Sequence, residues 1–182
     1  PWTLRYPLID WHGSNGNQMG DGPAAARYTE ARLSKLAEDG LLQGLKKKNV
    51  DWRPNYSEDE EEPVTLPAIF PNLLCNPNQG IGVAMACNWL PHNLRDVGNL
   101  ISKYMDEGVL DFEDMAPDFP TGGIIINGKE LKQIYATGKG KVVIRGKYEI
   151  ETRNKKNLIV FTEIPYTVKT EDLLDQINEA CA

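Results

Sequence analysis

Histidine and cysteine are scarce in this chain, and their spacing excludes the common metal-binding patterns. The 182 residues contain two histidines, His12 and His92, and three cysteines. Cys75, Cys87 and Cys181 form no Cys-x-x-Cys pair, and such isolated cysteines are typical of a reduced, cytosolic protein. We interpret each histidine as a surface or hydrogen-bonded side chain. No metal site is therefore expected within this chain.

Long apolar runs and targeting features are also missing. No apolar segment approaches the roughly 20 residues that span a bilayer, so no membrane role is expected. Residues 1–6 contain neither an initiator methionine nor the basic and apolar regions of a signal peptide. We therefore interpret the chain as a piece of a longer protein with a cytoplasmic location.

Negative charge exceeds positive charge, but the excess is concentrated in one place. The net charge is −6, and the run Glu58–Glu62 consists of five acidic residues. Such a run is usually a solvated loop. Basic residues cluster elsewhere, and each cluster is interpreted as a solvated face: Arg27, Arg32 and Lys35; Lys46–Lys48; Lys139–Lys147; and Arg153–Lys156. Charge therefore neither supports nor excludes nucleic-acid binding.

The first third of the chain predicts loops, a helix and a connector. Gly13–Pro23 is a glycine-rich loop that lacks the spacing of a dinucleotide fingerprint. Residues 28–33 fit either a strand or a helix. Ser34 is expected to cap a helix that ends with the cations of Lys46–Lys48. Residues 51–63 are predicted to form an exposed connector, which places a domain boundary there.

The rest of the chain is typical of a small mixed unit, so the predicted fold class is α+β. A proline-broken apolar segment at 64–74 is expected to be extended and buried. Helices are expected from Pro91 to Gly108, at Glu130–Thr137 with Gly138 closing it, and from Thr170. Strands are expected at 123–127, 141–148 and 157–163.

A tyrosine preceded by arginine is the strongest candidate for chemistry. Tyr28 follows Arg27 within the run Asp21–Ser34. A free phenol is almost entirely protonated at pH 7, so a tyrosine nucleophile needs a neighbouring positive charge. A guanidinium can stabilise the phenolate and pair with a phosphate oxygen as charge builds. On these two residues alone, a half-buried aromatic beside a surface charge is the favoured interpretation.

Cooperation between these two residues carries a geometric condition. On a regular strand, neighbouring side chains point to opposite faces. For Arg27 and Tyr28 to reach one phosphate, the backbone of residues 26–28 must depart from strand geometry. A regular strand there would argue against a shared role.

Four ordered motifs extend the pattern over nearly the whole chain, and together with Arg27-Tyr28-Thr29 they resemble the bacterial type IIA topoisomerase A subunits, gyrase A and topoisomerase IV A. The motifs are Leu4–Leu8 with His12–Gly16; Phe70–Asn76 with Gly80–Ala86 and Asn88–Leu94; Asp118–Gly122 with Ile124–Gly128; and Tyr135–Val142 with Glu163–Tyr166.

The resemblance implies a fold and a set of site residues. Residues 1–62 match the C-terminal part of a winged-helix (CAP-like) cleavage domain, and residues 63–182 match most of a tower domain. Tyr28 corresponds to the tyrosine that attacks DNA and stays joined to the 5′-phosphate, and Arg27 to the arginine that contacts the scissile phosphate. Ile81 corresponds to the isoleucine that wedges between base pairs, and Asn78 is a further DNA-binding candidate.

The resemblance also implies partners and cofactors. The parent protein would be an ATP-dependent type II topoisomerase, an isomerase, in which a homodimer of the A chain works with two B subunits on double-stranded DNA. Mg²⁺ and ATP would both be held by the B subunit. This chain would bind neither, and alone it is expected to be inactive. Gyrase and topoisomerase IV are not distinguished. The alternatives are a non-catalytic module that binds or bends DNA, and a structural interaction domain.

Three departures from the family pattern lie near the wedge residue. Asn76-Pro77-Asn78-Gln79 stands where Asn-Gly is usual, Ala84 where glycine is common, and Cys87 where threonine is common. These changes affect the expected conformation of the wedge loop and leave the Arg27–Tyr28 pair untouched.

Overall fold

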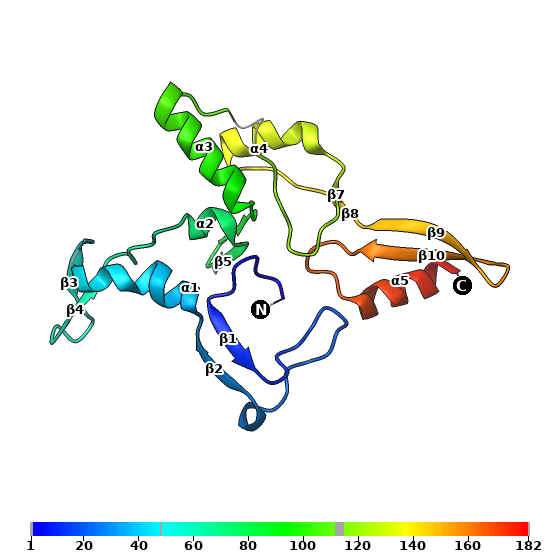
Figure 1. The fold of residues 1–182 in the computed structure, drawn as a ribbon, viewed down its shortest axis with the longest axis horizontal. Helices are drawn as coiled ribbons and strands as arrows, with labels where there is room; N and C mark the ends of the chain where they lie inside the picture. Colours follow the sequence, from blue (N-terminus) through cyan, green and yellow to red (C-terminus); the bar gives the residue numbers. More distant parts are fainter. Residues whose placement is uncertain (1, 48, 112–114, 182) are drawn as a thin grey trace. The chain divides into compact units, whose positions relative to one another are not determined.

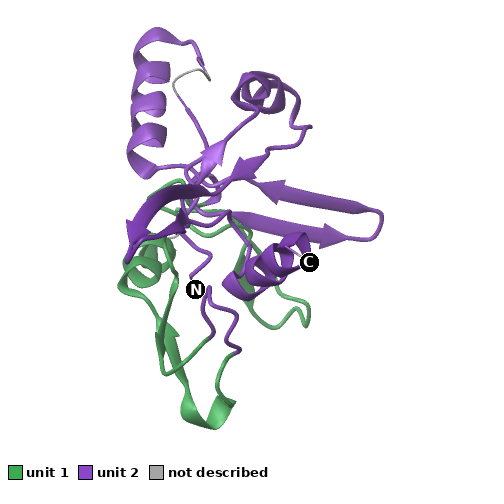
Figure 2. Cartoon of the chain, turned by 90° about the vertical axis from the view of Figure 1, so that its right-hand side faces the viewer, with its two compact units in different colours: residues 1, 6–15, 23–72 green, residues 2–5, 16–22, 73–182 purple. Residues whose placement is uncertain are grey.

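The described residues form a mixed structure of short helices and two-stranded antiparallel sheets, which confirms the α+β class. The structure is a computed structural model that describes residues 2–47, 49–111 and 115–181. These residues fall into two compact units (Figure 2). Unit 1 contains Tyr6–Asn15 and Pro23–Asn72, and unit 2 contains Trp2–Arg5, Gly16–Gly22 and the chain from Leu73 onward. The winged-helix and tower assignment remains a prediction.

A hairpin begins unit 1. Strand β1 (Ile9–His12) pairs antiparallel with β2 (Glu30–Leu33), so that His12 lies opposite Glu30 (Figure 1). A single 3-10 turn, η1 (Ala26–Tyr28), immediately precedes β2. The segment left ambiguous by the sequence is therefore a turn followed by a strand.

A helical segment follows β2, as the sequence predicts. It consists of α1 (Lys35–Ala37), one π turn η2 (Glu38–Leu42) and a 3-10 stretch η3 (Gln43–Lys47). The Ser34 Oγ accepts a hydrogen bond from the Ala37 N–H at 3.2 Å, which confirms the predicted cap. Lys46 and Lys47 lie in the last turn as expected, and Lys48 lies outside the described residues.

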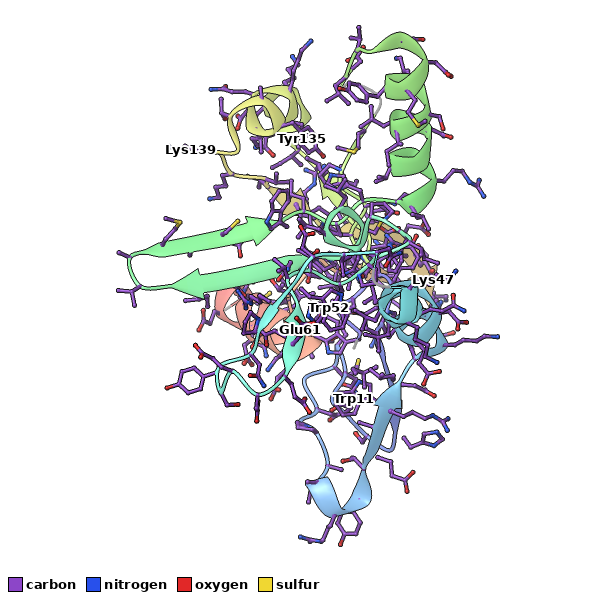
Figure 3. All side chains as sticks on the ribbon, turned by 90° about the vertical axis from the view of Figure 1, so that its left-hand side faces the viewer. Trp11, Lys47, Trp52, Glu61, Tyr135 and Lys139 are labelled. Atoms are coloured by element: carbon purple, nitrogen blue, oxygen red, sulfur yellow. The ribbon has the colours of Figure 1, made fainter. Side chains whose placement is uncertain are left out.

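The segment 51–63 is mostly exposed, as expected, but it forms a hairpin and not an irregular connector, and the domain boundary placed there remains a prediction. Strand β3 (Trp52–Pro54) pairs with β4 (Glu61–Pro63), and Figure 3 labels Trp52 and Glu61 on its two arms. The Asp59 Oδ1 accepts hydrogen bonds from Asn55 at 2.7 Å and from Ser57 at 2.9 Å, which closes the turn. Strands of three residues flanked by proline and glutamate carry almost no apolar alternation, so the pattern could not reveal them.

The helices of unit 2 lie close to their predicted places. Helix α3 (Leu94–Glu107) begins at the cap Asn93, two residues after Pro91, and ends at Gly108 with φ 70°. Its buried residues are Val97 and Leu100. The other elements are α2 (Asn72–Cys75), which begins at the last residue of unit 1, η5 (Gly128–Glu130), α4 (Leu131–Thr137), closed by Gly138 with φ 67°, and α5 (Thr170–Cys181).

The strands expected in the second half of the chain are also found, but one of them is divided into two. Strand β7 (Ile124–Ile125) pairs with β8 (Ile144–Arg145), and β9 (Lys147–Arg153) pairs with β10 (Lys156–Glu163). The strand expected at 141–148 is split at Gly146, where a Cβ atom would lie 2.7 Å from the Glu163 carbonyl oxygen. Close backbone approach at this glycine separates the two pairings.

A further hairpin stands where the sequence predicted only a wedge loop. Strand β5 (Asn78–Gly82) pairs with β6 (Met85–Trp89), and Ile81 lies opposite Ala86. Every residue from 78 to 89 is exposed. Ala84, in the two-residue turn, has φ 62°, a left-handed conformation that favours glycine. A glycine at this position would adopt the same backbone conformation without strain.

The base of the β5–β6 hairpin is buried. Cys75 and His92 are 0% and 2% exposed, and burial raises the pKa of the Cys75 thiol. The His92 Nδ1 and backbone N–H both approach the Leu74 carbonyl oxygen, at 2.8 and 2.9 Å, and its Nε2 lies 2.7 Å from the Tyr135 hydroxyl. Burial lowers the pKa of His92, outweighing the opposite effects of the Leu74 carbonyl and of the Asp118 and Asp96 carboxylates.

No helix in the described ranges is both long and apolar enough to cross a membrane.

We expect Ala84→Gly to stabilise the β5–β6 hairpin. An alanine in the left-handed region costs about 1–2 kcal/mol, of which the greater freedom of glycine in the unfolded chain offsets about 0.4–1 kcal/mol. Amide hydrogen exchange of residues 78–89 should slow by about two- to fivefold. Ala86→Gly is the matched control and should speed exchange, because glycine weakens a strand interior. Changes of the same sign in both variants would contradict this explanation.

The buried His92 makes stability depend on pH in a defined direction. The unfolded chain takes up a proton near pH 6.5, whereas the folded chain takes it up only at lower pH. The contribution of His92 to the free energy of unfolding should therefore be fully present above about pH 6.5. It should be lost as the pH drops through the folded-state pKa. Thermal unfolding followed by circular dichroism between pH 7.5 and 5.5 measures this slope. His92→Asn should flatten it, and an undiminished slope in that variant would assign the effect to other groups.

Candidate functional site

Tyr28 lies at the end of the single 3-10 turn η1 and is 67% exposed. Its N–H donates to the Ala25 carbonyl at 2.9 Å, and the Thr29 N–H donates to the Ala26 carbonyl at 3.3 Å. Thr29 then returns to extended backbone and leads into β2. The turn therefore holds the phenol outside the hairpin, where a macromolecular substrate can reach the hydroxyl.

Arg27 is brought to the same side as Tyr28 by this turn. The central carbon of its guanidinium lies 4.6 Å from the centroid of the Tyr28 ring. Such a contact contributes about 0.5–1 kcal/mol at an exposed site. The condition set by the sequence is confirmed, because the backbone of Ala26–Tyr28 is not a regular strand. One substrate group can therefore meet the guanidinium and the phenol together.

Gly13 permits the backbone path that presents Tyr28. Its φ is +91°, and a Cβ atom built on it would lie 2.8 Å from the Tyr28 carbonyl oxygen. Both observations exclude a side chain at this position without a shift of the turn. The glycine in the His12–Gly16 motif thus has a local structural reason.

A polar face on the hairpin was missed by sequence reasoning. Strand pairing places Asp10, His12, Glu30 and Arg32 on one face, adjacent to η1. The Arg32 Nε donates to Asp10 Oδ2 at 2.8 Å, and its Nη2 lies 2.9 Å from His12 Nε2. The signal that could have revealed this face is the register of β1 against β2, which a single sequence does not specify. The face adds a second oriented guanidinium to the same hairpin as Tyr28.

Ile81 and Asn78 lie in unit 2, on β5. Ile81 is 79% exposed, and Asn78 is also exposed. Because the two residues are three positions apart on one strand, their side chains point to opposite faces of the hairpin. Ile81 therefore presents an apolar side chain to solvent, and Asn78 does not share its contact surface.

Among the described residues, no three histidine, cysteine, aspartate or glutamate side chains lie close enough together to hold a metal ion. The acidic side chains of the β3–β4 hairpin pair instead with neighbours, as Glu62 does with Arg53 at 2.8 Å. The described part of the chain therefore does not fit a metal centre.

The whole chain, residues 1–182, matches the family model that describes the A subunits of DNA gyrase and topoisomerase IV. The chain belongs to this family. It is 43% identical to the DNA gyrase A subunit of Treponema pallidum and 44% identical to the DNA topoisomerase 4 A subunit of Bacillus subtilis, each over 184 residues and 98% of the chain. It is 46% identical over 183 residues, also 98% of the chain, to the DNA gyrase A subunit of Mycoplasma genitalium.

The match covers only part of these relatives. The chain spans 22%, 23% and 22% of their lengths, respectively. The resemblance seen in the motifs is confirmed at the level of the gyrase A and topoisomerase IV A family. The roles of Tyr28, Arg27, Ile81 and Asn78 remain predictions.

We expect Gly13→Ala to destabilise unit 1. A non-glycine residue in this backbone region costs on the order of 1–3 kcal/mol, and the Tyr28 carbonyl leaves no room for the added carbon. Chemical denaturation followed by circular dichroism should show the loss. Gly22→Ala is the matched control, since nothing lies within 4 Å of a Cβ there, and its effect should stay within about 0.5 kcal/mol. Equal effects from the two changes would remove the special role of Gly13.

Proposed function

We propose that the chain carries the DNA breakage–reunion residues of a type II topoisomerase, in its A subunit. The observation that carries the proposal is the η1 turn, which exposes Tyr28 and sets Arg27 over its ring. Membership of the gyrase A and topoisomerase IV A family supports the same reaction. Two copies in a dimer would cut both strands of a duplex, let a second duplex pass and then reseal the break.

In the proposed reaction, the Tyr28 hydroxyl oxygen attacks a backbone phosphorus. The bond from tyrosine oxygen to phosphorus forms as the bond from phosphorus to the 3′-oxygen breaks. The phenol proton passes to solvent, and the departing 3′-oxygen takes up a proton. Arg27 donates charge-assisted hydrogen bonds to a phosphate oxygen as its charge grows. Because a phosphodiester is exchanged for a phosphotyrosine ester, resealing is the same reaction reversed and consumes no ATP.

Ile81 is proposed as the wedge that bends the cleaved duplex. It lies on a hairpin whose residues 78–89 are all exposed, so its side chain is available for insertion between base pairs. Partial unstacking costs a few kcal/mol and is repaid when bent DNA contacts more protein. Asn78, on the opposite face of β5, is proposed to contact DNA separately.

The remaining components are proposed to come from partners. The parent chain would form a homodimer and bind two B subunits, which supply ATP hydrolysis and Mg²⁺. A cytoplasmic location is part of the same proposal. Relatives named gyrase and topoisomerase IV match at similar identity, so we make no choice between them.

Tyr28→Phe tests the chemistry directly. The full-length parent chain is mixed with its B subunit, Mg²⁺ and end-labelled duplex, and then denatured with detergent. The wild type should yield a protein–DNA adduct joined to the 5′ end, and Tyr28→Phe should yield none. Both should bind uncleaved DNA within about twofold of each other, because phosphate contacts dominate affinity.

Tyr56→Phe is the matched control, since Tyr56 is a fully exposed tyrosine of the same unit. It should keep the adduct. An adduct that persists in Tyr28→Phe would overturn the assignment of the nucleophile. No adduct from the wild type, with salt-dependent binding retained, would favour a DNA-bending module, for which the departures at Asn76–Gln79 are the present support.

A further inference from the structure

The orientation of the β5–β6 hairpin depends on the residues at its base. All residues from 78 to 89 are exposed, including Ile81 at 79% and Val83 at the tip. Burial begins where the chain enters and leaves the hairpin: Cys75 and Asn76 before it, and Pro91 and His92 after it, are buried. A force on Ile81 must therefore be resisted by these flanking residues.

One carbonyl closes the base. The Leu74 oxygen accepts hydrogen bonds from the His92 N–H at 2.9 Å and from the His92 Nδ1 at 2.8 Å. A carbonyl oxygen can only accept, so the Nδ1 carries the proton and the neutral ring leaves its Nε2 as an acceptor. His92 is 2% exposed, so water does not compete for these bonds.

Tyr135 connects this base to helix α4. Its hydroxyl lies 2.7 Å from the His92 Nε2 and donates to it, and Figure 3 labels Tyr135. The two rings also pack, with centroids 5.7 Å apart. Burial raises the pKa of Tyr135 to about 12, so the hydroxyl keeps the proton that this bond requires. The imidazole thus joins the chain before the hairpin, the chain after it, and a helix residue 43 positions further on.

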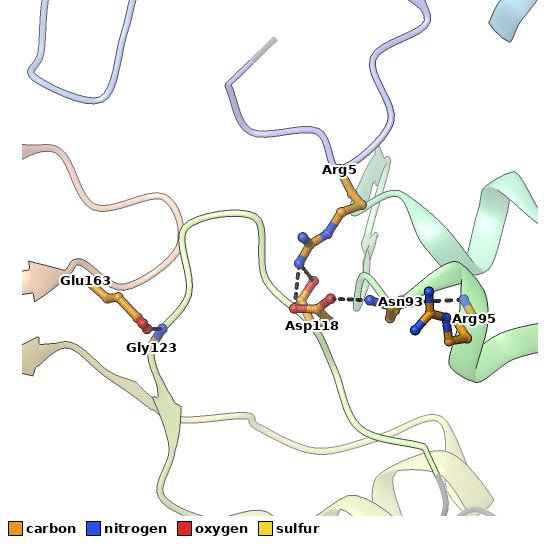
Figure 4. Close-up of polar contacts among 6 residues, drawn as sticks. All are labelled: Arg5, Asn93, Arg95, Asp118, Gly123 and Glu163. Carbon is orange, nitrogen blue, oxygen red and sulfur yellow. Dashed lines mark hydrogen bonds and ion pairs between the residues drawn. The ribbon is translucent and has the colours of Figure 1, made fainter.

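A second set of bonds fixes the segment on either side of His92. The Asp118 N–H donates to the Pro91 carbonyl at 2.8 Å. The Asp118 carboxylate accepts from Asn93 at 3.2 Å and pairs with Arg5 at 2.5 Å, as Figure 4 shows. Arg5 also donates to the Asp118 carbonyl at 2.9 Å. The backbone around His92 is therefore held independently, and the Tyr135 hydroxyl fixes the ring itself.

We propose that His92, oriented by Tyr135, is a positioning residue that sets the β5–β6 hairpin for DNA bending. The proposal rests on the proposed wedge function of Ile81. Unstacking a base step costs free energy, and a wedge can supply it only if the structure that supports the wedge does not yield. The hydrogen bond from Tyr135 to His92 supplies stiffness where the chain leaves the hairpin and enters buried structure.

Tyr135→Phe removes one hydroxyl and keeps the ring. The test uses the full-length parent chain with its B subunit, together with a duplex that carries a fluorescent dye at each end, so that energy transfer reports bending. Leaving the buried Nε2 without a donor should lower the bent-to-straight ratio on the order of tenfold. His92→Asn, whose amide can replace Nδ1 but not Nε2, should give a similar loss, and the double variant should lose no more.

Rescue of bending by an easily unstacked duplex distinguishes a positioning role from a general loss of structure. A duplex with a mismatch at the wedged step is easier to unstack, so it should restore bending and Tyr28 adduct formation in Tyr135→Phe. Tyr104→Phe, which removes a half-exposed hydroxyl from α3, should bend both duplexes like the wild type. Normal bending of the matched duplex by both Tyr135→Phe and His92→Asn would overturn the proposal, and so would a loss that the mismatch does not rescue.

Ile81→Ala distinguishes this failure from failure of the wedge itself. If Ile81→Ala abolishes bending while Tyr135→Phe does not, the wedge stands and the positioning role is wrong. If Ile81→Ala bends DNA normally, the proposed wedge is wrong and the positioning proposal falls with it.

Discussion

The single turn between the long loop and β2 is the constraint on which the candidate chemistry depends. Had residues 26–28 continued the strand, Arg27 and Tyr28 would face opposite sides. Instead, two backbone hydrogen bonds wind the chain once and then release it into the pairing with β1. The Arg27 guanidinium therefore lies over the ring of Tyr28, its neighbour in the sequence. The β1–β2 pairing holds the chain that follows the turn, and the turn leaves the Tyr28 side chain exposed.

The two candidate surfaces are built in the same way. Tyr28 and Ile81 both lie on exposed structure in or next to a two-stranded hairpin, and in each case a few buried or glycine positions set the backbone path. Gly13 makes room for the Tyr28 carbonyl, and His92 closes the base beneath Ile81. The two candidate side chains are exposed, whereas His92 is buried, so burial lies in the support and not in the candidate residues.

Sequence patterns predicted the helices and the strands of the second half well, but missed the β3–β4 and β5–β6 hairpins. Ser34, Gly108 and Gly138 are local signals whose chemistry acts within one turn, and each was found in its predicted role. Strands β3, β4 and β5 have three to five residues that include proline, glutamate or glycine, so they show no apolar alternation, and β6 has only five residues. The Arg27–Tyr28 pair was predictable from adjacent residues, whereas the Arg32–Asp10–His12 contacts depend on strand register.

The closed base of the β5–β6 hairpin separates the tip from the rest of unit 2. Leu74 and His92 are 18 residues apart and are joined through the Leu74 carbonyl. The segment between them therefore starts and ends at the same buried base. The side chains of residues 78–89, in the middle of this segment, are all exposed. Asn78, Ala84 and Cys87, which depart from the family pattern, all lie within it. A substitution there therefore replaces an exposed side chain and not one of the buried side chains at the base.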